Sequence, residues 1–180
     1  QWPWPRKRLA DLTRRLNDLG AAAIVYDMIF AESDRANIKS YISTLAEAKE
    51  RKYFEQLIST APDGDSDFAS AIKRSTVVLG EVVSESSVRI EKPKAGFVIL
   101  GDNPSAFLVT YQGIIAPFHE FYEATSGVGA TNWLPDHDQV VRRIPLLFRA
   151  GNEFTPSLAL EALRVAQGAQ SYIIKSSNAS

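Results

Sequence analysis

Hydrophobic residues recur at helical spacing near the start of the chain. Four leucines, separated by three, four and three residues, share one side of this segment: Leu9, Leu12, Leu16 and Leu19. This spacing predicts an amphipathic helix, which we expect Gly20 to end. Residues 21–30 are then apolar at both alternating positions, a pattern typical of a β-strand that is covered on both faces. A helix, a glycine and a buried strand in this order indicate an α/β sheet.

Helical and strand patterns alternate along the rest of the chain. They predict helices over 36–59, 68–72, 117–127 and 156–168, and strands over 76–80, 88–90, 96–100, 128–133 and 140–149. We interpret the last two strands as an antiparallel pair, and Gly151-Asn152 as a tight turn after them. The expected fold class is therefore α/β, with a central, partly parallel sheet, helices on both faces and an antiparallel C-terminal hairpin. We expect a single domain over 1–170 and a polar tail or linker over 171–180.

Composition excludes several kinds of site. The 180 residues carry 20 Lys and Arg against 21 Asp and Glu, so the basic excess typical of a general nucleic-acid binder is missing. With no cysteine and only His119 and His137 as histidines, thiolate zinc sites, disulfides and multi-histidine metal sites cannot form within one chain. We therefore expect no cofactor and no resident metal.

No apolar stretch approaches the ~18–20 residues of a membrane span. The chain begins at Gln1, and we expect it to be a fragment whose membrane segments lie outside it. The familiar nucleophile-elbow, phosphate-loop and zinc-protease motifs are absent from the sequence, so we expect the domain not to be an enzyme. One catalytic alternative stays open, a small hydrolase that uses Asp136 and Asp138 as an acid–base pair.

Six residues are candidates for binding a ligand. Asp27 is the one charge in an apolar strand, near its carboxyl end, where parallel sheets tend to place ligands. It either contacts a ligand there or forms a structural ion pair. Trp4 and Arg6 either build an aromatic wall with a cation or pack the start of the chain.

The remaining candidates come from one loop and the segment after it. Asp136 and Asp138 are alternate acids that suit a divalent cation, but they lack the other ligands of a calcium loop, so turn chemistry is the competing interpretation. Arg142 shares alternating positions with apolar residues and is expected to meet a carboxylate, either of a ligand or of Asp27, Asp136 or Asp138.

Three stretches in order carry a resemblance. They are Trp2-Pro3-Trp4-Pro5-Arg6, the Leu19–Phe30 strand region, and the Asn132-x-Leu134-Pro135-Asp136-x-Asp138 motif, which continues into Val140-Val141-Arg142-Arg143-Ile144-Pro145. The segment Thr155-Pro156-Ser157-Leu158 completes the pattern. Together they resemble the CHASE2 domain, the extracytoplasmic sensory module of bacterial transmembrane receptors. Gln139, where a glycine usually follows the two acids, departs from the pattern.

This resemblance implies a function that composition does not show. It implies an extracytoplasmic domain, periplasmic or at the cell surface, that senses a small-molecule or envelope ligand as a homodimer within a membrane-bound receptor. The receptor's output would be a cyclase, a kinase or a diguanylate cyclase. An interaction module for a protein or envelope component, without any small ligand, is the alternative; it predicts an exposed apolar patch and no deep pocket.

Overall fold

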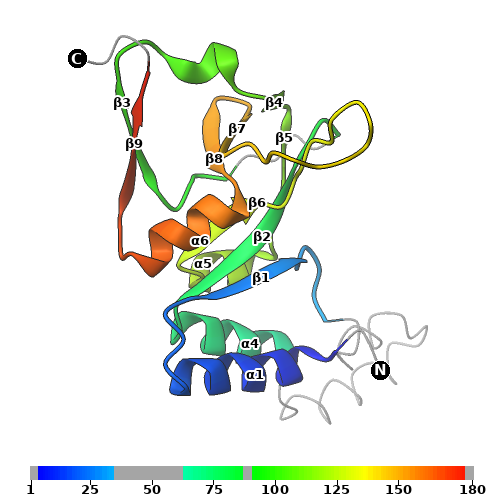
Figure 1. Ribbon diagram of the computed structural model, residues 1–180. Coiled ribbons are helices and arrows are strands. Elements are labelled where there is room, and N and C mark those ends of the chain that lie inside the picture. Colours follow the sequence, from blue (N-terminus) through cyan, green and yellow to red (C-terminus); the bar gives the residue numbers. More distant parts are fainter. Residues whose placement is uncertain (1–3, 35–62, 87–90, 177–180) are drawn as a thin grey trace.

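The computed structural model describes residues 4–34, 63–86 and 91–176 (Figure 1). Its helices are α1 (Arg6–Asp18), α4 (Gly64–Lys73), α5 (His119–Ala124) and α6 (Leu158–Ala166), with a 3-10 helix at Pro104–Phe107. Its strands are β1 (Ile24–Ile29), β2 (Val77–Ser84), β3 (Gly96–Leu100), β4 (Thr110–Tyr111), β5 (Gly113–Ile115), β6 (Gly127–Ala130), β7 (Leu147–Ala150), β8 (Glu153–Pro156) and β9 (Ser171–Lys175). The expected helix over 36–59 and strand over 88–90 lie outside the described residues.

Strand β2 is the central strand of the main sheet. Its first half pairs in parallel with β1 on one side and with β6 on the other, from Val77 to Glu81. Its second half pairs with β5 in antiparallel fashion, from Val82 to Ser84. Figure 1 shows β2 running from the helical end of the molecule to the end that holds the smaller sheets. The mixed, partly parallel α/β architecture is thus the one that the sequence predicts.

The first core lies between the parallel strands and the helices α1 and α4. Gly20, with a φ of +84°, ends the first helix region, and the side chain of Asp63 caps α4 by accepting a hydrogen bond from Asp65 N at 3.1 Å. Edge-to-face aromatic contacts fill the centre, with ring centroids 5.2–5.8 Å apart along the series Tyr26, Phe30, Phe68 and Phe121. We call this set, with Leu9, Ile72 and Leu79, the first core.

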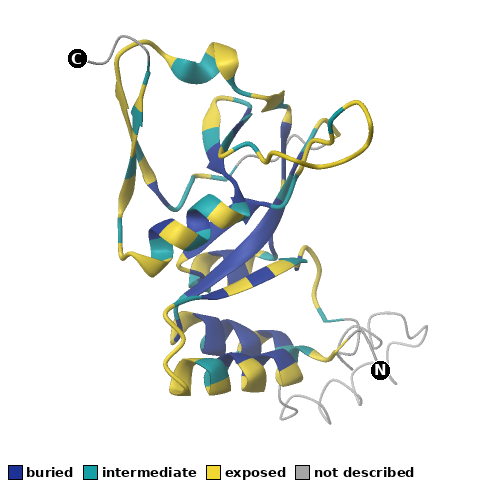
Figure 2. Cartoon of the chain, in the orientation of Figure 1, coloured by how far each residue is buried: buried dark blue, intermediate teal, exposed yellow. Residues whose placement is uncertain are grey.

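The second core lies at the other half of β2. It joins Val83 to seven other buried residues: Ile114, Ala116, Tyr122, Val128, Ala130, Phe148 and Ala150. Figure 2 colours β2 as buried along most of its length, which agrees with its contact to both cores. Helix α6 covers β6 and β2. A Cβ on Gly129 of β6 would lie 2.6 Å from Leu158 Cα, so glycine is required for this close approach.

Two smaller sheets complete the described structure. The predicted tight turn at Gly151-Asn152 joins β7 to β8, which form an antiparallel hairpin in place of the predicted pair 128–133 and 140–149, and β4 joins β7 in parallel. β3 pairs in parallel with β9. The prediction of a tail from residue 171 was therefore wrong for β9, because Tyr172 and the residues after it form a paired strand.

Three other expectations need correction. β1 is buried at alternate positions and exposed at Val25 and Ile29, so it is not covered on both faces. The expected strands over 128–133 and 140–149 shrink to β6 and β7, which are not paired with each other. The apolar residues between them, such as Val140 and Ile144, are about half exposed.

Among the described helices, none combines the length and the apolar character that a membrane crossing requires.

Candidate functional site

Glu81 is a carboxylate placed where the two cores meet. It follows Gly80 on β2, pairs with Ala130 of β6, and is the last residue of the parallel part of the sheet. Side chains alternate along a strand, so Glu81 shares a face with Leu79 of the first core and Val83 of the second. It is only 5% exposed. The carboxyl edge of a parallel sheet, where the strand order changes, is the usual place for ligands in α/β proteins.

The Glu81 side chain lines a cavity that is about 10 Å³ in volume, the size of one water molecule. Its walls are about half apolar, and the polar residues besides Glu81 come from several elements: Glu91, Lys94, Tyr122, Glu153 and Thr155. Among the described residues, Glu81 Oε2 has no hydrogen-bond partner. A buried carboxylate without a partner is costly in its charged form, because it has lost its hydration.

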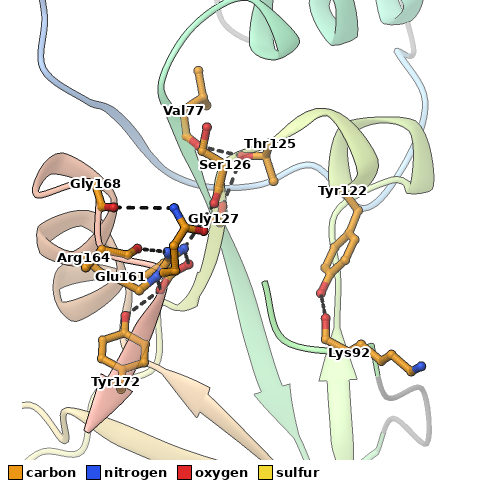
Figure 3. A network of polar contacts seen from close by, with 12 residues as sticks. Val77, Lys92, Tyr122, Thr125, Ser126, Gly127, Glu161, Arg164, Gly168 and Tyr172 are labelled. Carbon is orange, nitrogen blue, oxygen red and sulfur yellow. Dashed lines mark hydrogen bonds and ion pairs between the residues drawn. The ribbon is translucent and has the colours of Figure 1, made fainter. Parts of the chain in front are cut away.

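Burial and, after it, the negative charges of Glu161 and Glu91 together raise the pKa of Glu81 to about 8. Glu81 therefore carries a proton at neutral pH. Tyr122, on the cavity wall, also has a raised pKa, because it is buried and lies near Glu81 first and other carboxylates after it. Its hydroxyl donates to the carbonyl of Lys92 at 2.6 Å (Figure 3).

A second buried carboxylate, Glu161 of α6, is fully paired (Figure 3). Arg164 donates to both of its oxygens, at 2.6 and 2.9 Å, and Tyr172 of β9 donates to Oε2 at 2.6 Å. The Arg164 guanidinium also donates to the carbonyls of Ala169 and Ser126. This network ties α6 to β9 and to the start of β6. A Cβ on Gly127 would lie 2.5 Å from Glu161 Oε1, so the glycine leaves room for the carboxylate.

The Asn132-containing motif has a structural task in this fold. Asn132 Oδ1 accepts from Val83 N at 2.8 Å, and its Nδ2 donates to Val83 O at 3.0 Å, so its amide pairs with β2 as another strand would. Just before it, Thr131 donates from N and from Oγ1 to the carbonyl of Glu81. These bonds fix the backbone of β2 at the Glu81 carbonyl and at Val83, two residues further along the strand.

Arg6 lies at the carboxyl end of β1, without Trp4. Its guanidinium is 4.5 Å from the ring centre of Phe30, and its Nε lies 3.5 Å from Asp65 Oδ1. Burial lowers its pKa, while Asp65 and Asp34 act in the opposite direction. Trp4 is 37% exposed and contacts Arg8 instead. The structure thus separates the two residues that the sequence suggested as one wall.

The other candidates lie apart from the Glu81 cavity. Asp27 is exposed on β1. Arg142 bonds Asp138 at 2.8 and 2.9 Å and Asp136 at 2.9 Å, all three with exposed side chains, so the expected arginine–carboxylate pair forms in an open loop. Hydrogen bonds from Arg142 lower the pKa of Asp138. The hydrolase alternative needs a raised pKa in a cleft and is contradicted by this arrangement.

Sequence reasoning missed Glu81, Glu161 and Arg164. The predicted strand ended at Gly80, although Val82 and Val83 continue it, and a charge between two apolar pairs was the available signal. The Glu-x-x-Arg spacing in α6 puts both residues on one helix face, which was the signal for the ion pair. Within the ranges 4–34, 63–86 and 91–176, no group of three or more Asp, Glu or His side chains is arranged to hold a metal ion.

The comparisons with known proteins come from three searches. The family model described as the CHASE2 domain matches residues 1–178. The search of curated proteins and the search of solved structures each returned no match.

Proposed function

Because this chain belongs to the CHASE2 family, an extracellular sensory module of signalling receptors, we propose that it is the ligand-sensing domain of a membrane-bound receptor. The domain would lie in the periplasm or at the cell surface and act on a cyclase, kinase or diguanylate cyclase output. Support beyond the family comes from one observation. Within the described part of the chain, the buried Oε2 of Glu81 has no hydrogen-bond partner, and the side chain lines a cavity at the point where β2 joins the two cores.

A sensor responds only when its ligand binds one of two states more tightly. We propose that the cavity supplies this difference in affinity, because Glu81 stands between the two halves of β2. Glu81 is flanked by Val83 in the second core and by Leu79 in the first. We propose a homodimer as the assembly that carries the response, since a two-fold interface can repack between two arrangements.

The test is made in the full-length receptor that contains this domain. Receptor output is measured in cells for the unchanged protein, for Glu81→Gln, and for Glu85→Gln as a matched control on an exposed position just after β2. We expect Glu81→Gln to fix the output at one level while surface expression is unchanged, and Glu85→Gln to respond normally. Equal responses from all three proteins would contradict the proposal.

A second candidate function, an interaction module for a protein or envelope component, has its own supporting observation. The β3–β9 sheet exposes apolar side chains along both strands: Val98, Ile99, Leu100 and Ile173, which are 37–65% exposed. Nearby in the chain, Phe107 is 87% exposed. In the same receptor assay, this candidate predicts that Ile173→Lys abolishes the response and that Glu81→Gln leaves it intact.

A further inference from the structure

The Glu81 side chain lines a cavity, and its buried Oε2 has no hydrogen-bond partner among the described residues. Two more carboxylates, Glu91 and Glu153, line the cavity against one cation, Lys94, whose Nζ lies 4.8 Å from the centre of the Tyr122 ring. The excess of carboxylate groups suits the cavity to a cation that carries N–H groups.

The size and the polarity of the cavity further restrict the class of ligand that can bind. The inner space admits one group of the size of water. Apolar side chains make up much of the wall: Pro93, Ile114, Val128, Ala150, Phe154 and Pro156. Such walls favour an organic cation, which needs less hydration than a bare inorganic ion. Glu153 lines the cavity and is itself exposed, so we place the outer end of the ligand beside it.

We propose that this cavity binds a small cation with a primary ammonium group, with Glu81 as its counter-ion. This inference rests on the proposed sensory function and names the ligand class for it. The ammonium group donates hydrogen bonds to the Glu81 carboxylate, which removes the cost of burying that charge alone. Binding then replaces the proton of Glu81 by the cation, at the junction of the two cores.

The charges around Glu81 determine how binding depends on pH. Because the pKa of Glu81 is about 8, the cation competes with a proton below this pH, and the apparent affinity falls about tenfold for each pH unit. The groups that face Glu81 from the surrounding elements are Glu91 and Lys94, Tyr122 of α5, Glu153 of β8, and Glu161 of α6. Tyr122 keeps its proton over the range of the experiment, since its pKa is raised.

The experiment measures the melting temperature of the 180-residue chain with methylammonium chloride, and with tetramethylammonium chloride at equal ionic strength as the control without N–H groups. At pH 8 we expect methylammonium to raise the melting temperature in a saturable way, with tetramethylammonium having no such effect. Between pH 7 and pH 6 the apparent affinity should fall about tenfold. Glu81→Gln should abolish the effect, and Glu85→Gln should retain it.

Two results would overturn the inference. One is an equal shift from both salts, and the other is an equal methylammonium shift in Glu81→Gln and the unchanged protein. Each would be read beside the receptor assay. If methylammonium fails while Glu81→Gln still fixes receptor output, the ligand class is wrong and the sensory function stands. If receptor output ignores Glu81 while methylammonium binds through it, the site is real and the proposed function is wrong.

Discussion

The two cores on either side of β2 are built differently. The first core is closed by interlocking aromatic rings, and its buried hydroxyls of Thr13 and Tyr26 bond each other at 2.8 Å. The second core borders two buried carboxylates: Glu161, which is paired with Arg164, and Glu81, whose Oε2 has no hydrogen-bond partner among the described residues. The first core also borders a buried carboxylate, Asp65, but Arg6 lies 3.5 Å from it as a counter-ion. A buried carboxyl without a counter-ion changes its charge most readily when the pH or the bound ions change. We call the first core and the helices that cover it the frame, because we expect its stability to change little with pH. The second core, beside Glu81, is the half of the domain in which the charge can change with pH or with a bound ligand.

The largest expected loss of stability comes from a substitution in the first core. Phe68→Ala removes a ring that is fully buried among Tyr26, Phe30 and Phe121. We expect the free energy of unfolding to fall by about 3–5 kcal/mol, by the same amount at pH 6 and pH 9. Urea denaturation at both pH values measures this, with Phe107→Ala, on an exposed ring, as the matched control. A strongly pH-dependent loss in Phe68→Ala would contradict the division into frame and responsive half.

A comparable loss is expected where the second half holds its paired charge. Arg164→Leu leaves Glu161 buried without its counter-ion, at a cost of about 3–5 kcal/mol. The double variant Glu161→Met with Arg164→Leu should recover much of this loss, because no uncompensated charge remains. Chemical denaturation of the three proteins checks the comparison. A double variant no more stable than Arg164→Leu would show that packing, and not charge, dominates here.

Glu81→Gln should change how the free energy of unfolding depends on pH. The pKa of Glu81 is about 8 in the folded protein, against 4.5 ordinarily. Between these values the folded state holds a proton that the unfolded chain has released, so stability falls by about 1.4 kcal/mol per pH unit and levels off above about pH 8. Gln removes this fall, and the variant should be a few kcal/mol more stable than the unchanged protein at pH 9. Parallel pH profiles for the two proteins would refute this.

A smaller loss is expected at the amide that extends the sheet beside Glu81. Asn132→Ala leaves the backbone N–H and C=O of Val83 without these partners, which costs about 1–3 kcal/mol. Asn152→Ala is the matched control, because Asn152 bonds only the exposed Arg149 side chain among the contacts shown for it. Thermal unfolding compares the two. Equal melting temperatures for both variants would mean that Asn132 does not act as a strand surrogate.

The smallest effect is expected in the exposed loop. Asp138→Asn removes a carboxylate that bonds Arg142 in solvent, and exposed ion pairs contribute little to stability. We expect an unchanged melting temperature at neutral pH and no change in methylammonium binding. A clear loss of methylammonium binding would assign the ligand to this loop and not to the Glu81 cavity.

The sequence predicted the frame better than the responsive half. Helical leucine spacing and an apolar strand repeat locally, and these patterns yielded α1 and β1 in the right order. The position of Glu81 depends on β2 continuing past Gly80 to meet β5 and β6, which are distant in sequence. Likewise, the helix predicted over 156–168 forms as α6, and it buries Glu161 and Arg164 while Leu163 is 54% exposed. Local periodicity cannot show that Arg164, besides pairing with Glu161, will donate to the backbone carbonyls of Ala169 and Ser126.

The candidate site was harder still, because each charged residue had to be assigned a partner across the fold. Arg142 was expected to meet a carboxylate of a ligand or of Asp27, Asp136 or Asp138, and it bonds the two that are near it in sequence, Asp136 and Asp138. Arg6 and Trp4 are neighbours in sequence, but the Phe30 ring and Asp65 draw Arg6 inward. For Glu81 the sequence offered only a charge among apolar residues, and its burial in the folded chain is what identifies it as a candidate.

The most direct test of the account is a carbon-13 NMR titration of the Glu81 side-chain carboxyl, assigned by comparison with Glu81→Gln. We expect the Glu81 carboxyl to titrate with a midpoint near pH 8 in the free protein, and with a lower midpoint when methylammonium is added. A midpoint near the ordinary value of 4.5 would contradict it, because Glu81 would then be charged at neutral pH and already satisfied within the fold.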